Sequence, residues 1–158
     1  MTQFQKISLM LLRVSLGGLL LYAGITKVLN PAWTAKGYLM GAKTFPGLYQ
    51  WFASTENIGW VNFLNEWGLT LVGFALILGI FTRLASSFGI LLMLLYYLPI
   101  LQFPFVGEHS FIVDEHIIYI FALYVVGAFH SGRVWGLENW CSNLPICAKF
   151  PRLRKWIG

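Results

Sequence analysis

Four long apolar segments constrain the fold of this chain more than any other feature. They lie at about 7–28, 59–81, 84–102 and 111–132. An α-helix needs about 20 apolar residues to cross the hydrocarbon core of a bilayer, which is about 30 Å thick. The sequence therefore predicts an all-α integral membrane protein, built as a bundle of four transmembrane helices.

The composition supports lipid as the solvent of these segments. The chain has 158 residues, of which 58% are hydrophobic and 11% charged, whereas soluble domains average about 45–50% apolar and about 25% charged residues. A soluble core of this size could not bury so much apolar surface. No A-x-A-like cleavage site follows the first segment, so we expect it to remain as a span. We expect one domain, 1–158, without a strong internal repeat.

The formal net charge of +5 admits nucleic acid as a partner, but the pattern argues against it. The basic residues lie between or beyond the apolar segments, without the interleaved aromatics of a nucleic-acid groove. Basic residues gather at the end that carries both termini. The positive-inside rule therefore predicts cytoplasmic termini, in a bacterial or archaeal cytoplasmic membrane. The basic, aromatic C-terminal segment is expected to lie at the membrane interface.

Two cysteines, Cys141 and Cys147, occur in that C-terminal segment. Two residues without CxxC spacing cannot complete a zinc or iron–sulfur site. In the cytoplasm both thiols would stay reduced, whereas an inverted topology would allow a disulfide between them. Whether they are redox-active stays open.

The connections between the segments differ in length. A long outer loop, 29–58, is rich in aromatic residues and suggests packing at the interface, including a short surface helix. The second connection is tight, around Thr82 and Arg83. The third, 103–110, contains Pro104 and Gly107, which stop a helix.

Ionisable residues from three segments are predicted to share one outer layer. Asp114, Glu115 and His116 lie in the first turns of the fourth segment, Glu66 lies near the start of the second, and Lys27 closes the first. An unpaired charge at mid-bilayer costs roughly 2.5–3.5 kcal/mol on insertion scales. We therefore expect Lys27 to pair with Glu66 or Asp114.

Small and polar residues recur at helical spacing on these same three segments. The three faces are Arg13, Gly17, Leu20, Gly24 and Lys27; Glu66, Thr70, Gly73 and Ile77; and His116, Ile120, Leu123, Gly127 and His130. Glycines on such faces allow helices to approach closely. We expect the three helices to turn these faces toward one another.

Arg13 is about 21 Å along the first helix from Lys27 and belongs to the inner half. The first expectation is that it snorkels to the cytoplasmic headgroups. The alternative is an inner polar pocket shared with His130 and Arg133.

Several of these residues also have purely structural interpretations. Acids suit the first turn of a helix, so Asp114 could simply cap one, and His116 alone would more often be a hydrogen-bonded structural residue. Aromatic side chains could line a flat ligand such as a quinone ring, although aromatics near a membrane interface are usually anchors. The aromatic candidates for substrate binding are Tyr22, Trp67, Tyr97 and Tyr119, together with Tyr96.

The chain resembles the DoxX/DoxD membrane proteins over nearly all of its length. The resemblance rests on LLRVSLGGLLLYAGITKVLNPAW, FLNEWGLTLVGFALILGIFTRLA and VDEHIIYIFALYVVGAFHSGRVWGLENW. It is closest to the DoxD-like branch, the large subunit of thiosulfate:quinone oxidoreductase. The resemblance implies a four-helix membrane fold, oxidation of thiosulfate to tetrathionate, transfer of electrons to the quinone pool, and a small partner subunit.

The candidate residues can be matched to that chemistry. A thiosulfate dianion needs cations or helix N-termini, which Lys27, His116 and two helix starts of the outer layer would offer. Arg13 is a further substrate-binding candidate. Quinone reduction takes up protons, for which Glu66, Asp114, Glu115 and His116 are the catalytic candidates. The nearby acids oppose an anion unless they are protonated or paired. We see no haem, flavin, nicotinamide or metal motif, and quinone would be the electron acceptor.

Two other functions fit the same residues. In one, the chain is a non-enzymatic membrane subunit or assembly factor, and the polar cluster only holds the helices together. In the other, it is a small proton-coupled carrier that works as a homo-oligomer. Glu66→Gln would cost the first of these stability but no turnover, and flux into sealed vesicles would reveal the second.

Overall fold

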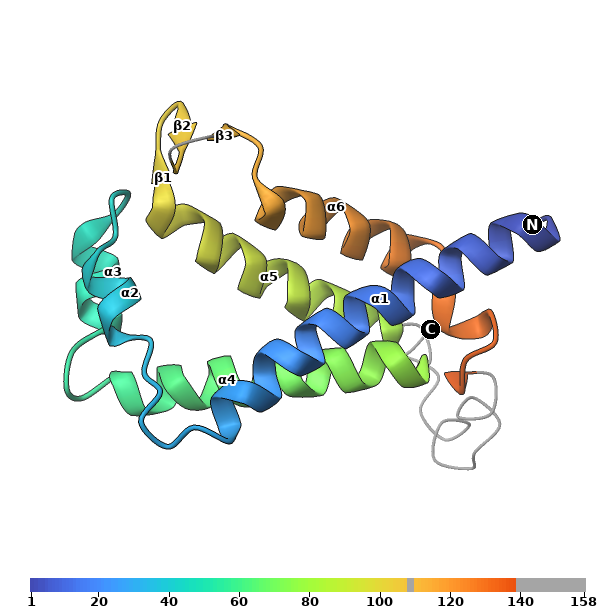
Figure 1. Ribbon diagram of the computed structural model, residues 1–158, viewed down its shortest axis with the longest axis horizontal. Coiled ribbons are helices and arrows are strands. Elements are labelled where there is room, and N and C mark those ends of the chain that lie inside the picture. The colour runs from blue at the N-terminus through green and yellow to red at the C-terminus, as the bar shows by residue number, and fades with distance from the viewer. Residues whose placement is uncertain (108–109, 139–158) are drawn as a thin grey trace.

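The computed structural model describes residues 1–107 and 110–138 (Figure 1). Cys141, Cys147 and most of the basic C-terminal segment lie outside the described residues. The helices are α1 (Gln3–Val28), α2 (Lys36–Met40), α3 (Pro46–Phe52), α4 (Ile58–Leu78), α5 (Thr82–Ile100), α6 (Glu115–Ala128) and the 3-10 helix η1 (Ser131–Arg133). The strands are β1 (Leu101–Gln102), β2 (Phe105–Val106) and β3 (Ser110–Phe111).

Three of the helices, α1, α4 and α5, are long and apolar enough to cross a membrane. The fourth, α6, has 14 residues and is about 21 Å long, so it is shorter than the predicted span 111–132. Phe111 belongs to β3 and Ile112 has a positive φ of 56°. Asp114 then caps the helix by accepting the backbone N–H of Ile117. The chain ahead of Glu115 therefore forms a strand and a turn, and the helix begins only at Glu115.

The other boundaries lie within a few residues of the prediction. α4 ends at Leu78 because Gly79 takes the left-handed conformation (φ 66°) of a helix C-cap. α5 begins directly after Phe81, which is also left-handed. The helices therefore end and begin two to three residues earlier than the predicted spans 59–81 and 84–102. The turn between them consists of apolar residues, so hydropathy alone does not locate it.

The predicted glycine-lined contact between the first two long helices is confirmed. A Cβ on Gly17 would lie 2.8 Å from the side chain of Ile77 and 3.0 Å from the carbonyl oxygen of Gly73. A Cβ on Gly73 would lie 2.6 Å from the Cα of Leu21. Only glycines allow the two backbones to approach this closely. α1 thus packs along α4, while α5 packs along α6.

The long loop 29–58 is ordered and forms α2 and α3, as the aromatic content suggested. Tyr49 of α3 is buried, and its hydroxyl donates to the carbonyl of Leu95 on α5, 3.2 Å away. Lys43 donates its backbone N–H to the carbonyl of Pro99 at 2.7 Å. The loop is therefore attached to the end of α5. The connection 103–110, predicted only as a loop, contributes to a small antiparallel sheet in the order β1-β2-β3.

The two ends of the molecule differ in construction (Figure 1). α2, α3, the strands and the N-terminal ends of α4 and α6 lie together at one end, which we call the outer end. The N-terminus, the α4–α5 turn and η1 lie at the opposite, inner end. Each end therefore collects its own set of polar side chains.

Candidate functional site

A cavity of about 420 Å³ lies at the outer end, where five helices meet. It is lined by Lys27, Trp33, Thr34, Ala35, Tyr38, Asn65, Tyr96, Ile100, Glu115 and His116. The structure thus brings together Lys27, Glu115 and His116, three of the residues that the sequence placed in one layer. We call this space the polar cavity.

Lys27 provides the positive charge of the polar cavity. Its ammonium group donates to the side-chain oxygen of Asn65 at 3.0 Å. It also lies 5.0 Å from the ring centre of Trp33 and 5.5 Å from that of Tyr96, within the range of cation–π attraction. Within the described residues the predicted ion pair with Glu66 or Asp114 does not form. The partner is Asn65, because that side chain is the one that α4 turns toward α1.

Glu66 follows Asn65 by one residue, which is about 100° around the helix. It is half-buried and does not line the polar cavity. Its backbone carbonyl accepts the hydroxyl of Thr70 at 2.7 Å. Glu66 remains near enough to act on Lys27 through its charge. Its catalytic role stays a prediction.

Asp114 and His116 form a pair at the start of α6. One carboxylate oxygen of Asp114 caps the helix by accepting the N–H of Ile117 at 3.2 Å. The other lies 2.6 Å from Nδ1 of His116. The structural interpretation of Asp114 as a cap is thus confirmed, and the residue has a second contact besides. A carboxylate on one imidazole nitrogen orients the ring and leaves the other nitrogen available for a ligand or a proton.

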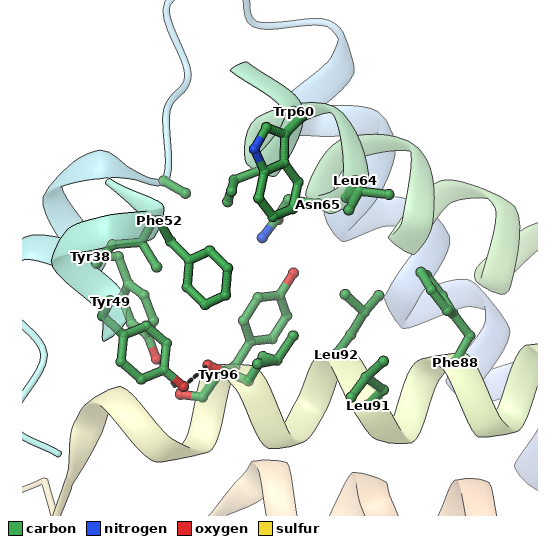
Figure 2. Close-up of a pocket in the computed structure, with 14 residues that line it drawn as sticks. Tyr38, Tyr49, Phe52, Trp60, Leu64, Asn65, Phe88, Leu91, Leu92 and Tyr96 are labelled. Atoms are coloured by element: carbon green, nitrogen blue, oxygen red, sulfur yellow. Dashed lines mark hydrogen bonds between the residues drawn. The ribbon is translucent and has the colours of Figure 1, made fainter. Parts of the chain in front are cut away.

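A second, apolar cavity of about 180 Å³ adjoins the first. Its walls come from α2, α3, α4 and α5, and Figure 2 shows their side chains converging on it. The lining residues are Ala35, Tyr38, Leu39, Tyr49, Phe52, Trp60, Val61, Leu64, Asn65, Phe88, Leu91, Leu92, Leu95 and Tyr96. We call this space the aromatic cavity. Ala35, Tyr38, Asn65 and Tyr96 line both cavities.

Tyr96 forms the main wall between the two cavities. Figure 2 shows its ring standing away from α5 toward Asn65 and Trp60. Its hydroxyl is buried and interacts with the side chain of Asn65, although no hydrogen bond of full geometry forms. On the other side its ring meets that of His116 edge-on, with centres 6.2 Å apart. Tyr96 thus contacts the ionisable groups of one cavity and directs its hydroxyl toward the other.

Tyr38 completes this wall from α2. Its hydroxyl donates to the backbone carbonyl of Tyr96. Burial raises the pKa of Tyr38 to about 12, and the nearby Tyr49 and Asp114 add to the effect. Tyr38 is therefore a neutral hydrogen-bond donor at physiological pH.

The other aromatic candidates lie apart from both cavities. Tyr22 is 75% exposed on α1, and Trp67 is 42% exposed beside Phe63 on α4. Tyr97 is buried and donates to the carbonyl of Ile112 at 2.6 Å, which ties α5 to the segment before α6. Tyr119 packs against the core between the helices. Their substrate-binding roles stay predictions, and this placement favours Tyr96.

Arg13 is at the inner end and does not snorkel. It is 1% exposed, and its guanidinium donates to the backbone carbonyls of Ser131 and Val134, the latter at 3.2 Å. Carbonyls left over at the end of a helix are acceptors that need a donor, and they lie nearer than any headgroup. Gly79 and Gly136 leave room for the guanidinium, because a Cβ would lie 2.6 Å and 2.8 Å from its Nη1.

The expectation of snorkelling is therefore wrong, and Arg13 lies in an inner pocket whose acceptors are the carbonyls of Ser131 and Val134. That His130 and Arg133 share this pocket stays a prediction.

The acid of this inner pocket is Glu138, which sequence reasoning missed. It is 1% exposed and accepts the hydroxyl of Thr82 at 2.9 Å. Burial raises the pKa of its carboxyl above the ordinary value, against the lowering effects of the Thr82 hydrogen bond and of the charges on Arg133, Arg13 and Arg83. A signal was present, since Glu138 is the one acid after the fourth apolar segment.

Sequence reasoning also missed most walls of the two cavities. The sequence places Tyr49 and Phe52 only in the aromatic loop 29–58, and it gives no role to Trp60. Sequence reasoning considered Glu66 but not the neighbouring Asn65. The useful signal was Asn65, since an amide inside an apolar segment needs a partner.

Within the described residues, no three His, Cys, Asp or Glu side chains are grouped so that they could hold a metal ion. The apolar helices define the chain as an integral membrane protein. The DoxX family model matches residues 8–100 of this sequence, more than half of its length. The chain therefore belongs to the DoxX family, a family of membrane proteins. No curated protein and no solved structure matches it.

Proposed function

We propose that this protein is the membrane subunit of an oxidoreductase that oxidises thiosulfate to tetrathionate and passes the electrons to quinone. The observation that carries the proposal is the shared wall of the two cavities. Tyr96 and Asn65 separate a polar cavity that contains Lys27 from an aromatic cavity with few polar groups. A small anion and a flat, lipid-soluble ring would thus lie on either side of one tyrosine.

The aromatic cavity suits the quinone ring. Its walls are aromatic and aliphatic, as is usual for sites that bind flat organic ligands. A quinone carbonyl only accepts hydrogen bonds, and the buried hydroxyl of Tyr96, which interacts with Asn65 without a hydrogen bond of full geometry, can donate one. Trp60 and Phe52 lie on the same side of the cavity as that hydroxyl (Figure 2).

The polar cavity suits the anion. Lys27 supplies one positive charge, and a protonated His116 would supply a second. Glu115 opposes an anion, so Lys27 would have to offset its charge. Asp114 stays directed at the cap and at the imidazole.

The reaction balances with these two substrates alone. Two thiosulfate ions lose two electrons and form the central S–S bond of one tetrathionate. The quinone takes up the two electrons and two protons and becomes a quinol. His116, oriented by Asp114, is the proposed proton donor on the side of Tyr96, and Glu66 is the proposed relay. A small partner subunit would complete the enzyme, which would lie in a bacterial or archaeal cytoplasmic membrane with both termini inside.

The experiment is thiosulfate-dependent reduction of a soluble quinone by the purified protein in detergent. His116→Ala and Glu66→Gln should both abolish most of the turnover while the protein stays folded. Glu56→Gln, at an exposed acid outside both cavities, is the matched control for Glu66→Gln and should keep wild-type turnover.

Absence of turnover in the wild type, even with a candidate small subunit added, would overturn the proposal. In that case Glu66→Gln should lower only the melting temperature if the chain is a structural subunit. Proton-coupled flux into sealed vesicles would instead indicate the carrier.

A further inference from the structure

An apolar groove runs between α4 and α5 on the side of the molecule that faces lipid. It has a volume of about 440 Å³. It is lined by Gly68, Leu71, Val72, Phe74, Ala75, Ile80, Phe81, Leu84, Ala85 and Phe88. Phe88 also lines the aromatic cavity. The groove and the cavity are therefore neighbours along the same pair of helices.

The groove exists because α4 and α5 each pack mainly on another helix. α4 lies along α1, and α5 lies along α6, while the two follow one another closely in sequence. Figure 1 shows α4 and α5 diverging from the tight turn at the inner end, with α2 and α3 across the gap at the outer end. The space between them widens toward the aromatic cavity.

The closed outer end limits what can occupy this space. Tyr49, Leu39 and Ala53 of the long loop are buried in an apolar cluster that packs against Val61 of α4 and Leu98 of α5. A partner helix is about 10–12 Å wide with its side chains, and this cover would stop it before the membrane surface. A thin hydrocarbon chain that ends in a flat ring can follow the groove and finish under the cover.

The dimensions agree with such a molecule. From Val61 to Ala75 the combined walls extend about 21 Å along α4, which is a large part of one bilayer core of about 30 Å. Gly68 lies at the junction of groove and cavity. A Cβ there would lie 3.0 Å from the ring of Phe88 and 3.4 Å from the methyl Cδ1 of Leu92. The ring of Phe88 therefore packs directly over Gly68, at the boundary between the groove and the cavity.

We infer that the groove between α4 and α5 binds the hydrocarbon tail of the quinone whose ring occupies the aromatic cavity. The natural acceptor is then a long-tailed membrane quinone that enters from the lipid, ring first. The identity of the ring rests on the proposed function. The tail site rests on the groove, on the side chain of Phe88 that lines both the groove and the cavity, and on the cover formed by α2 and α3.

The test compares two quinones that have the same ring, one with a ten-carbon tail and one without a tail. Binding to the purified protein is followed by quenching of tryptophan fluorescence, since Trp60 lines the aromatic cavity. The wild type should bind the tailed quinone at least tenfold more tightly than the tail-less one. Gly68→Leu should remove most of this preference, which is read as the ratio of the two affinities because the added side chain also presses on Phe88 and Leu92 of the aromatic cavity.

Two further variants keep the result interpretable. Gly18→Leu on α1 points into open space, with nothing within 4 Å of its Cβ, and should keep the wild-type preference although it adds the same side chain. Leu71→Phe narrows the groove from its exposed rim without adding a tryptophan to the readout, and it should lower the preference if Gly68→Leu does not fold. An unchanged preference in every folded groove variant would overturn the inference.

Failure of the inference and failure of the proposed function give different results. Tail-dependent binding that Gly68→Leu removes, without any thiosulfate-driven reduction, would keep the tail site and reject thiosulfate as the donor. Turnover with equal KM for both quinones in wild type and Gly68→Leu would keep the function and reject the tail site.

Discussion

At the scale of single residues, the two cations of α1 have different roles, and their surroundings in the structure distinguish these roles where the sequence could not. Lys27 faces a cavity and has one direct hydrogen bond, to Asn65. Arg13 is buried, and its Nη1 donates hydrogen bonds to two backbone carbonyls. Because they lie about 21 Å apart along one helix, they cannot bind the same small ligand. Lys27 is the candidate for substrate, and Arg13 holds the inner end together.

Lys27→Met is expected to weaken the binding of thiosulfate. A hydrogen bond to a charged group contributes about 1.5–3 kcal/mol, so the KM for thiosulfate should rise about 10- to 100-fold. Steady-state kinetics at saturating quinone would measure it. Lys36→Met, at an exposed lysine of α2, is the control and should leave the KM unchanged. If Lys27→Met has the wild-type KM for thiosulfate, the anion binds at another site.

Glu138 should give the protein a pH-dependent stability. Because burial raises the pKa of its carboxyl in the folded state above the ordinary value of 4.5, the unfolded state releases this proton first as the pH rises. The contribution of Glu138 is thus fully present below about pH 4.5 and is lost as the pH rises through the folded-state pKa. Glu138→Gln removes this group from the titration.

The measurement is the melting temperature in detergent as a function of pH. The melting temperature of Glu138→Gln minus that of the wild type should increase as the pH rises above 4.5. Any difference in packing between the protonated carboxyl and the amide of glutamine adds an offset that does not depend on pH, so the slope is the readout. Glu56→Gln is expected to follow the wild-type slope. A difference that falls with rising pH would mean that the nearby arginines outweigh burial.

At the scale of elements, the contact of α1 with α4 depends on glycines from both helices. Gly73→Ala would place a Cβ 2.7 Å from the carbonyl oxygen of Gly17. Overpacking of this kind costs about 1–3 kcal/mol, which should lower the melting temperature by about 2–12 °C. Gly18→Ala points into open space and should leave the melting temperature equal or higher, since alanine favours a helix over glycine. Equal melting temperatures for both variants would show that the helices can separate without cost.

Helical periodicity was enough to predict this interface, and the reason is local. Residues three and four apart share a face, so the small residues of α1 and α4 could be assigned to one side each. The partner of Lys27 could not be predicted in the same way. Asn65 and Glu66 are adjacent, and the choice between them depends on the rotation of α4 about its own axis. That rotation is set by the packing of both helices.

At the scale of the whole molecule, the two ends differ in chemistry, and the orientation in the membrane decides which cavity faces outside. The positive-inside rule predicts that the end with the N-terminus is cytoplasmic. We test this on a chain whose two native cysteines are replaced by serine. A single cysteine is then introduced at Thr2 or at Glu56, both exposed, and labelled with a membrane-impermeant maleimide.

Glu56→Cys should react in intact cells, because it lies in the loop that carries α2 and α3. Thr2→Cys should react only after the membrane is opened. The reverse pattern would place the polar cavity on the cytoplasmic side. Thiosulfate would then have to reach the site from inside the cell.

The amino-acid sequence by itself determined that this chain is a membrane protein, where its long helices lie, that the glycine-lined faces of α1 and α4 approach one another, and that one layer collects Lys27, Glu115 and His116. These properties follow from local composition and from the helical period. The predicted third face is different, since Gly127 of α6 lies against Ser86 of α5. The tertiary structure alone decided that Tyr96 and Asn65 divide two cavities, that α2 and α3 cover one of them, that α6 begins only at Glu115, and that Glu138 joins Arg13 at the inner end. Each of these depends on contacts between residues far apart in the chain, and no local pattern specifies which of several polar or aromatic side chains will meet.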